Sequence, residues 1–403
     1  METATEKRAF VLELGRLLHE SGASAGRLET ALRGASAELD LEAEVFSTPT
    51  GLTVSFGEMG SQQTSVMRVV PGEVHLEKLA MVDAVAERVA AGELSVRDGR
   101  AELRAIVRAP NRWPRWLMIV AQIVIAAGAA RIFGGSLGDA VAASVLGGVI
   151  AALTWALQRN EHSAYLTDFG AGAVVAAGAL AWDRFVFPIS EYPVTLAAII
   201  VLIPGLTLTL SISELATRHL VSGTARLMGG LMVLVSLGFG VAIGRQLERV
   251  LPPMAETGPG VTAQGELGQA IAIGLLGVML AIVFRARPRD IVPVVLAVSL
   301  GVYGARFGAS ILSPELGPAI GAFVLGLFSN AWSRLRRQPA AITTIPALLP
   351  LVPGSIGFTG LNAMLTDDTM TGVETFFTML LVGVSLVAGL LLANVVYGPR
   401  KAV

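Results

Sequence analysis

Residues 203–223 read IPGLTLTLSISELATRHLVSG, and residues 352–372 read VPGSIGFTGLNAMLTDDTMTG. In each stretch a Pro-Gly pair interrupts a long apolar run, and a second glycine follows 18 positions after the first, at Gly223 and Gly372. Proline has no amide hydrogen to donate inside a helix, and glycine weakens a helix interior. Each pair therefore predicts a break in a helix, and the two breaks lie 149 residues apart.

The spacing of 149 residues continues on both sides of the breaks. A cluster of small residues, a Val-Ser-Leu triplet and a single glycine all recur at this spacing, and a tryptophan recurs at 150. The matched positions are Gly172-Ala173 with Gly321-Ala322, Val235-Ser236-Leu237 with Val384-Ser385-Leu386, Gly240 with Gly389, and Trp182 with Trp332. Collinear matches of this kind indicate a duplicated segment.

Ten apolar stretches are long enough to cross a bilayer, which takes about 20 helical residues. They are residues 116–133, 137–157, 164–182, 193–213, 227–246, 266–284, 290–306, 316–333, 340–362 and 375–397. The sequence therefore predicts a mostly α-helical membrane protein with ten transmembrane helices in two five-helix repeats, residues 113–250 and 251–403. Five is an odd number, so the repeats must be inverted relative to each other, as in many secondary transporters.

The basic residues of the connections predict the orientation, because cytoplasmic loops accumulate Lys and Arg. With residues 1–115 inside, thirteen basic residues fall on the inner side and five on the outer side. The inner residues are Arg112, Arg115, Arg159, Arg218, Arg226, Arg285, Arg287, Arg289, Arg334, Arg336, Arg337, Arg400 and Lys401; the outer ones are Arg131, Arg184, Arg245, Arg249 and Arg306. This asymmetry predicts cytoplasmic termini and a multi-pass protein of the inner (plasma) membrane.

Residues 1–112 differ in composition from the rest of the chain. The first 110 residues hold 29 of the 61 charged residues, although they are little more than a quarter of the sequence. Helical periodicity over 6–39, short alternating stretches over 41–70 and charged helical sequence over 73–108 predict a small cytoplasmic α+β domain.

Composition excludes several classes of protein. The chain has no cysteine, which excludes disulfides, thiolate nucleophiles and the common structural zinc sites, and neither a metal nor another cofactor is expected. The net charge of −1 argues against nucleic-acid binding. A GxSxG pattern at 134–138 lies at an outer turn, across the predicted membrane from His162 and His219, and no nucleotide-binding P-loop is present. We therefore do not expect an enzyme.

The candidate substrate site lies at the two Pro-Gly breaks. The breaks are interpreted either as packing kinks, which transmembrane helices tolerate, or as splits that expose two half-helix N-termini able to bind a carboxylate. Polar side chains at spacings of four and three follow each break and favour the split. The candidate substrate-binding residues are Gly205, Thr207, Ser211, Glu214, Gly354, Ser355, Thr359 and Asn362.

Glu214 and Asp168 are the candidates for proton coupling, because charge inside a membrane is costly without a role. Glu214 is equally compatible with a solvated charge at the edge of a loop, near Arg218. Asp168 is also explained as a plain anion at the N-terminus of a helix.

Four segments resemble the threonine/serine exporter family of bacteria and archaea. They are LGRLLHESGASAGRLETAL at 14–32, STPTGLTVSFGE at 47–58, IPGLTLTLSISELATRHLVSGTARL at 203–227 and ALLPLVPGSIGFTGL at 347–361. The resemblance covers nearly the whole chain, and it implies export of small amino acids, driven by the proton motive force.

The first functional hypothesis is therefore a secondary-active, proton-coupled exporter of threonine or serine. The alternatives are a dicarboxylate (succinate-like) exporter on the same scaffold, and a passive channel or signalling protein whose N-terminal domain is the working part. A small-molecule substrate, protons and membrane lipid are the expected partners. A homo-oligomer is compatible with the sequence, and nucleic acid is not expected.

Overall fold

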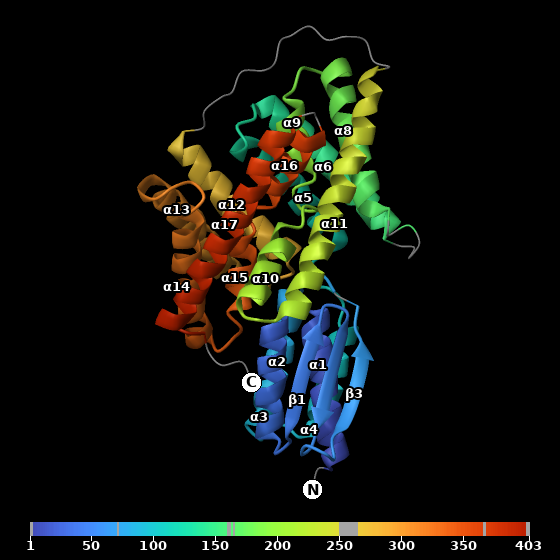
Figure 1. Cartoon of the computed structure of the whole chain (residues 1–403), viewed down its shortest axis with the longest axis vertical. Coiled ribbons are helices and arrows are strands. Elements are labelled where there is room, and N and C mark those ends of the chain that lie inside the picture. Colours follow the sequence, from blue (N-terminus) through green and yellow to red (C-terminus); the bar gives the residue numbers. More distant parts are fainter. Residues whose placement is uncertain are drawn as a thin grey trace.

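A small N-terminal domain adjoins a larger body of helices in the computed structural model of the chain (Figure 1). The structure describes residues 3–70, 72–158, 163, 166–249, 265–365 and 368–399. The predicted division at 250/251 between the two repeats lies outside these ranges, as do three of the basic residues used for the orientation, Arg159, Arg400 and Lys401.

The N-terminal domain packs helices against one face of an antiparallel sheet whose strand order is β1-β2-β3. In β2 the side chains of Leu52, Val54 and Phe56 are buried and alternate with half-buried ones, as expected of a strand with one covered face. The strands predicted within 41–70 are confirmed. The elements are α1 (Ala4–Glu20), α2 (Ala25–Glu38), β1 (Ala43–Thr48), β2 (Gly51–Phe56), β3 (Gln63–Arg68), α3 (Leu76–Ala90) and α4 (Val96–Arg108).

The helical body follows, and both predicted helix breaks are present in it. The stretch predicted at 193–213 is two helices, α9 (Glu191–Ala198) and α10 (Gly205–Ala216), and the stretch predicted at 340–362 is α15 (Ala341–Leu348) and α16 (Gly354–Leu365). The other elements are α5 (Arg115–Ile132), α6 (Leu137–Leu157), α8 (Thr167–Phe185), α11 (Leu220–Arg245), η1 (Gln246–Arg249), α12 (Glu266–Val283), η2 (Pro288–Asp290), α13 (Ile291–Ile311), α14 (Gly317–Arg336) and α17 (Thr369–Val396).

Six helical segments among the described residues are long and apolar enough to cross a membrane. They are Arg115–Ile132, Leu137–Leu157, Leu220–Arg249, Glu266–Val283, Pro288–Ile311 and Thr369–Val396. The predicted number of ten is not reached on this criterion. The helices α9, α10, α15 and α16 have only 8 or 12 residues each, and α8 and α14 carry polar and charged residues such as Asp183 and Asn330.

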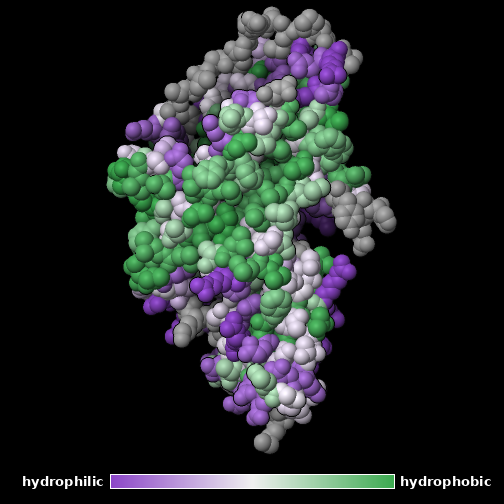
Figure 2. Space-filling model, in the orientation of Figure 1, coloured by the Kyte–Doolittle hydropathy of each residue, from purple (hydrophilic) through white to green (hydrophobic). Residues whose placement is uncertain are grey.

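Hydrophobic residues dominate the surface of the helical body. Figure 2 shows a broad hydrophobic area on the face in view, with hydrophilic residues over the N-terminal domain and at the opposite end. A body with an apolar flank between two polar ends fits a lipid bilayer. The chain is thus a multi-pass membrane protein. We call the end of the body that touches the N-terminal domain the proximal end, and the opposite end the distal end.

The helices pack in the same pairs in the part of the body before residue 250 and in the part after residue 264. The helix α8 packs on α11 as α14 does on α17, and α5 packs on α6 as α12 does on α13. The matched glycines sit at these contacts: an ideal Cβ on Gly240 would lie 2.2 Å from the carbonyl oxygen of Phe169, and one on Gly389 would lie 2.2 Å from that of Ala319. Contacts this close require glycine.

Candidate functional site

The two broken helices touch each other at the points where α10 and α16 begin. An ideal Cβ on Gly354 would lie 2.7 Å from the Cα of Gly205, and one on Gly205 would lie 3.2 Å from the Cα of Gly354. Both glycines are buried. From this crossing, α10 extends toward the proximal end and α16 toward the distal end (Figure 1). Two helix N-termini therefore meet at one buried point.

The crossing has an electrostatic consequence. In α10 the amide of Leu208 donates to the carbonyl of Pro204 at 2.9 Å, and in α16 the amide of Gly357 donates to that of Pro353 at 3.0 Å. The amides at the start of a helix have no acceptor within it, and they give the N-terminus a partial positive charge; the amide of Gly205 donates to the carbonyl of Ile203 at 2.8 Å. The half-helices α9 and α15 end close by, and their C-terminal carbonyls carry the opposite sign. Opposite partial charges therefore lie near one another at the crossing.

Two adjoining cavities lie beside the crossing, and both are lined by Phe133 and Ser355. The cavity at the crossing has a volume of about 110 Å³, and the one toward the start of α9 has about 300 Å³. We call them together the crevice. The lining of the first is Ile125, Ala129, Ile132, Phe133, Ile200, Ile203, Gly205, Leu276, Leu280, Leu349, Pro350, Val352, Gly354 and Ser355. The lining of the second is Phe133, Tyr192, Pro193, Leu196, Ser355, Ile356 and Thr359.

The polar side chains of the crevice gather at its distal part. The Tyr192 hydroxyl on α9 is hydrogen-bonded to the Thr359 hydroxyl on α16, which also donates to the carbonyl of Ser355 at 2.9 Å. These hydroxyls face an otherwise apolar wall, an arrangement typical of sites for small polar ligands. Within the described part of the chain, no group of three or more His, Asp or Glu side chains is placed to hold a metal ion.

Four of the predicted site residues come together at the crevice, and four do not. Gly205, Gly354, Ser355 and Thr359 line it. The others are Thr207, Ser211, Glu214 and Asn362, and none of them lines either cavity.

Three of these four residues contact other parts of the helical body. Thr207 faces Gly230 of α11, because an ideal Cβ there would lie 3.6 Å from the Thr207 methyl group. The Ser211 hydroxyl donates to the carbonyl of Leu208 at 2.6 Å. Asn362 accepts a hydrogen bond from Arg245 at 3.4 Å.

The two predicted proton-coupling residues lie away from the crevice. Glu214 is nine residues beyond Gly205, about 14 Å along the helix, and its carboxylate contacts the N-terminal domain. Asp168 lies in the first turn of α8, half-buried, and does not line either cavity.

Two buried aspartates that the sequence analysis missed hold the starts of the broken spans. Asp139 is fully buried, and its Oδ1 accepts a hydrogen bond from the amide of Ser190, just before α9, at 2.7 Å. Asp290 is 3% exposed, and its Oδ1 accepts one from the side chain of Gln338, just before α15, at 3.4 Å. The capping pattern Ser136-x-x-Asp139 was a usable signal for the first of them.

Tyr192 was also missed, although it lines the crevice. It lies one residue before the apolar stretch predicted at 193–213, so a reading confined to the apolar runs passed over it. Few residues of this chain combine an aromatic ring with a hydroxyl, since it has only four tyrosines. A tyrosine next to a proline at the start of a broken span was the available signal.

Two known protein families match the chain over separate ranges. The family described as "Putative threonine/serine exporter" matches residues 9–248, and the one described as "Threonine/Serine exporter, ThrE" matches residues 269–396. No solved structure matches the chain.

Among curated relatives, proteins named pheromone-regulated membrane protein 10 are similar over most of the chain. The one from Candida albicans is 23% identical over 91% of this chain and 34% of its own length. The one from Yarrowia lipolytica is 26% identical over 88% of this chain and 30% of its own, and the one from Eremothecium gossypii 24% over 98% and 56%. The chain thus spans about a third to a little over half of the length of these relatives.

Proposed function

The chain belongs to the threonine/serine exporter family, and we propose that it is a secondary-active exporter of small hydroxy amino acids, threonine or serine. The family consists of membrane exporters and not of enzymes. The substrate of this chain, its binding site and the coupling of transport to an energy source are the proposed features.

The observation that carries the proposal is the meeting of two helix N-termini beside a cavity. A free amino acid carries a carboxylate and an ammonium group a few ångströms apart. The carboxylate would be stabilised by the amides at the starts of α10 and α16, and the ammonium by the carbonyls at the ends of α9 and α15. A side-chain hydroxyl would then reach Ser355, Thr359 or Tyr192, which lie on the distal side of the crossing. The zwitterion and its hydroxyl thus each have a matching group.

The proposal includes ten spans in two inverted five-helix repeats, divided near residues 112 and 250, and a cytoplasmic N-terminal domain. The duplication is supported by the matching helix pairs, α8 on α11 with α14 on α17, and α5 on α6 with α12 on α13. A further support is that an ideal Cβ on Gly223 would lie 2.9 Å from the amide nitrogen of Leu215, and one on Gly372 would lie 3.0 Å from that of Met364, which is 149 residues further on. Ten spans result when α9 with α10 and α15 with α16 each form one span and α8 and α14 are added to the six long apolar helices.

Single cysteines test this topology without background, because the chain has none. The proposal expects Arg336→Cys to be shielded from an impermeant thiol reagent in intact cells and Asp368→Cys to be labelled. Labelling of Arg336→Cys from outside would contradict the orientation.

Transport would proceed by rocking one repeat against the other around the crossing, in the plasma membrane, with protons as the driving ion. Glu214 and Asp168 remain the proposed proton carriers. Glu214→Gln or Asp168→Asn should then lose gradient-driven accumulation but keep substrate exchange, since exchange does not return an empty carrier. If both variants accumulate substrate normally, the protons use another path.

Counterflow in proteoliposomes tests the function itself. Labelled threonine and serine should exchange, and a pH gradient should drive their net movement. Exchange of succinate without threonine would favour the dicarboxylate alternative, which the two converging helix N-termini also suit. Uniform leakage of all three without saturation would indicate a passive channel.

A further inference from the structure

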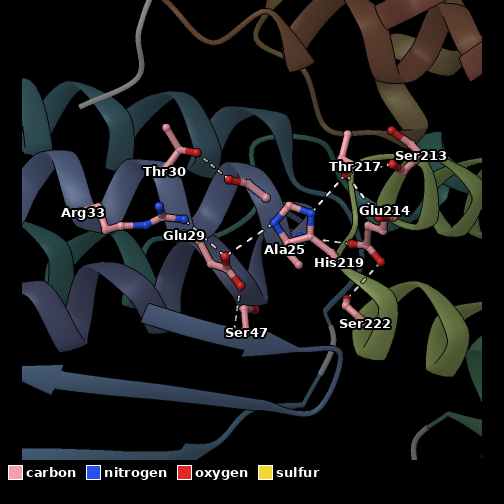
Figure 3. Close-up of polar contacts among 11 residues, drawn as sticks. Ala25, Glu29, Thr30, Arg33, Ser47, Ser213, Glu214, Thr217, His219 and Ser222 are labelled. Carbon is pink, nitrogen blue, oxygen red and sulfur yellow. Dashed lines mark hydrogen bonds and ion pairs between the residues drawn. The ribbon is translucent and has the colours of Figure 1, made fainter. Parts of the chain in front are cut away.

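The N-terminal domain is fastened to the helical body by a buried carboxylate of the broken helix α10. Glu214 is 2% exposed, and its Oε1 accepts a hydrogen bond at 3.0 Å from the amide of Ala25, the first residue of α2 (Figure 3). Its Oε2 accepts from the Ser222 hydroxyl at 2.9 Å and from Nε of Arg226 at 3.1 Å, both on α11. The carboxylate thus joins α10, α11 and the N-terminal domain at one point.

The contact completes the start of α2. A helix leaves its first amides without acceptors, and a side chain at the residue before the helix normally caps them. The corresponding residue of α2 is Ser24, whose side chain makes no such hydrogen bond. Glu214 supplies the acceptor instead, and its negative charge suits the positive end of the helix. The cap of this helix therefore comes from another domain, 189 residues away.

A second contact lies one turn further along α2. Glu29 is 8% exposed, its Oε1 accepts from the amide of Ser47 at 3.1 Å, and its Oε2 lies 3.4 Å from Nε2 of His219, in the connection between α10 and α11 (Figure 3). The His219 ring lies directly on the α2 backbone, because an ideal Cβ on Gly26 would lie 2.9 Å from its Cε1 atom. We call the contacts of Glu214 with Ala25 and of Glu29 with His219 the latch.

The N-terminal domain also holds the second half of the body, in a different way. At the start of α3 the amides of Leu76 and Glu77 donate to the carbonyls of Phe284 and Arg285, just after α12, at 3.0 and 3.1 Å. In the connection between the domain and α5, the Trp113 indole donates to the next carbonyl, that of Ala286, at 2.8 Å. Two backbone amides of the domain thus donate to successive backbone carbonyls of the second half, whereas the latch depends on two carboxylate side chains.

We propose that Glu214, beside the proton-carrying role proposed above, is also a positioning residue: it latches the N-terminal domain onto α10, and the latch must open each time α10 moves relative to the second half. The inference rests on the proposed function, because it presupposes that the two halves rock against each other. A domain tied to both halves cannot keep both attachments while they separate. The domain stays with the second half, since two backbone hydrogen bonds and the ion pair of Glu73 with Arg285 hold it there, and the side-chain contacts on the first half are the ones that release.

A pair of cysteines at Gly26 and His219 tests the latch. Cross-linked Gly26→Cys/His219→Cys should lose at least tenfold of its threonine counterflow in proteoliposomes, and reduction should restore it. Cross-linking Glu73→Cys with Arg285→Cys, an ion pair between the domain and the second half, should leave counterflow within about twofold. The pair Glu44→Cys/Ser55→Cys, paired across β1 and β2, controls for the chemistry inside the domain.

The unmodified protein provides a second readout that does not depend on these variants. Amide hydrogen exchange at residues 25–29 should speed up several-fold when threonine is being transported, while exchange at residues 76–80 stays unchanged. Full transport by the cross-linked Gly26/His219 pair, or unchanged exchange at 25–29 during transport, would overturn the latch alone. If the wild type moves neither threonine nor serine, the proposed function fails and the latch fails with it.

Discussion

The half-helices α10 and α16 begin alike and end differently. Each has 12 residues, begins with the glycine of a Pro-Gly pair and packs against the other at that glycine. Near its end, α10 carries Glu214, which is buried and joined to Ala25, Ser222 and Arg226. Near its end, α16 carries Asn362, half-buried, at 3.4 Å from Arg245. The two half-helices thus begin in the same way but are fastened differently: the end of α10 by a buried carboxylate and the N-terminal domain, and the end of α16 by an amide that binds an arginine.

The largest effect is expected where the two half-helices are alike. Gly354→Ala and Gly205→Ala add a Cβ where the backbones touch, and overpacking of this kind costs about 1–3 kcal/mol. If this free energy is added to the activation barrier of transport, counterflow drops by about 10- to 100-fold. Gly205→Leu and Gly354→Leu should abolish counterflow. Gly229→Ala on α11 is the matched control, because nothing lies within 4 Å of its Cβ position. Normal transport by both alanine variants would favour the interpretation as packing kinks.

The next effect concerns the last turns of α10 and α16, which are held by different contacts. Glu214→Ala leaves the Arg226 guanidinium, which is mostly buried, without its carboxylate, and breaking such a pair costs about 3 kcal/mol. Asn362→Ala removes a neutral acceptor and should cost about 1 kcal/mol or less. The apparent melting temperature of the purified protein should therefore fall much more for Glu214→Ala than for Asn362→Ala. Equal losses would show that the two ends are fastened equally.

A smaller effect is expected at the distal part of the crevice. Tyr192→Phe removes the hydroxyl that meets Thr359 and should raise the KM for threonine by about 2- to 10-fold, the worth of one hydrogen bond. Tyr303 on α13 is 45% exposed, and the Arg306 guanidinium lies over its ring. The variant Tyr303→Phe is therefore the control and should leave the KM unchanged. If both variants behave alike, the Tyr192 hydroxyl does not contribute to the substrate site.

The smallest effect concerns the attachment of the N-terminal domain to the second half. Burial, aided by the nearby charges of Arg285 and Lys78, lowers the pKa of His75 from its ordinary value of 6.5. Below pH 6.5 the unfolded chain takes up a proton that the folded chain does not, so this histidine costs stability as the pH falls, and has no such effect above pH 7.

Replacing His75 tests whether it lowers the stability of the folded protein as the pH falls. Asparagine can cap α3 in its place. His75→Asn should therefore weaken the loss of thermal stability between pH 7.5 and 5.5. A steeper loss in the variant would contradict the direction of the pKa change.

Features that depend on local sequence could be predicted, and those that depend on distant partners could not. The helix breaks at 204 and 353 and the strands of residues 43–68 follow from proline, glycine and a period of two, which act over a few residues. That Gly205 and Gly354 touch, or that Glu214 caps a helix 189 residues earlier in the chain, depends on how whole helices pack. Of the eight residues predicted beside the breaks, four line the crevice, whereas Thr207, Ser211, Glu214 and Asn362 are on other sides of the same helices.

Accessibility of a cysteine at position 355 is the most direct measurement of a substrate site at the crossing that opens to each side in turn. Ser355 lines both cavities, and the chain has no other cysteine to react. We predict that Ser355→Cys in oriented vesicles is labelled by an impermeant thiol reagent from either side of the membrane, and that threonine or serine slows the labelling from both sides. Labelling from one side only under every gradient, with no protection by either amino acid, would contradict the proposed mechanism.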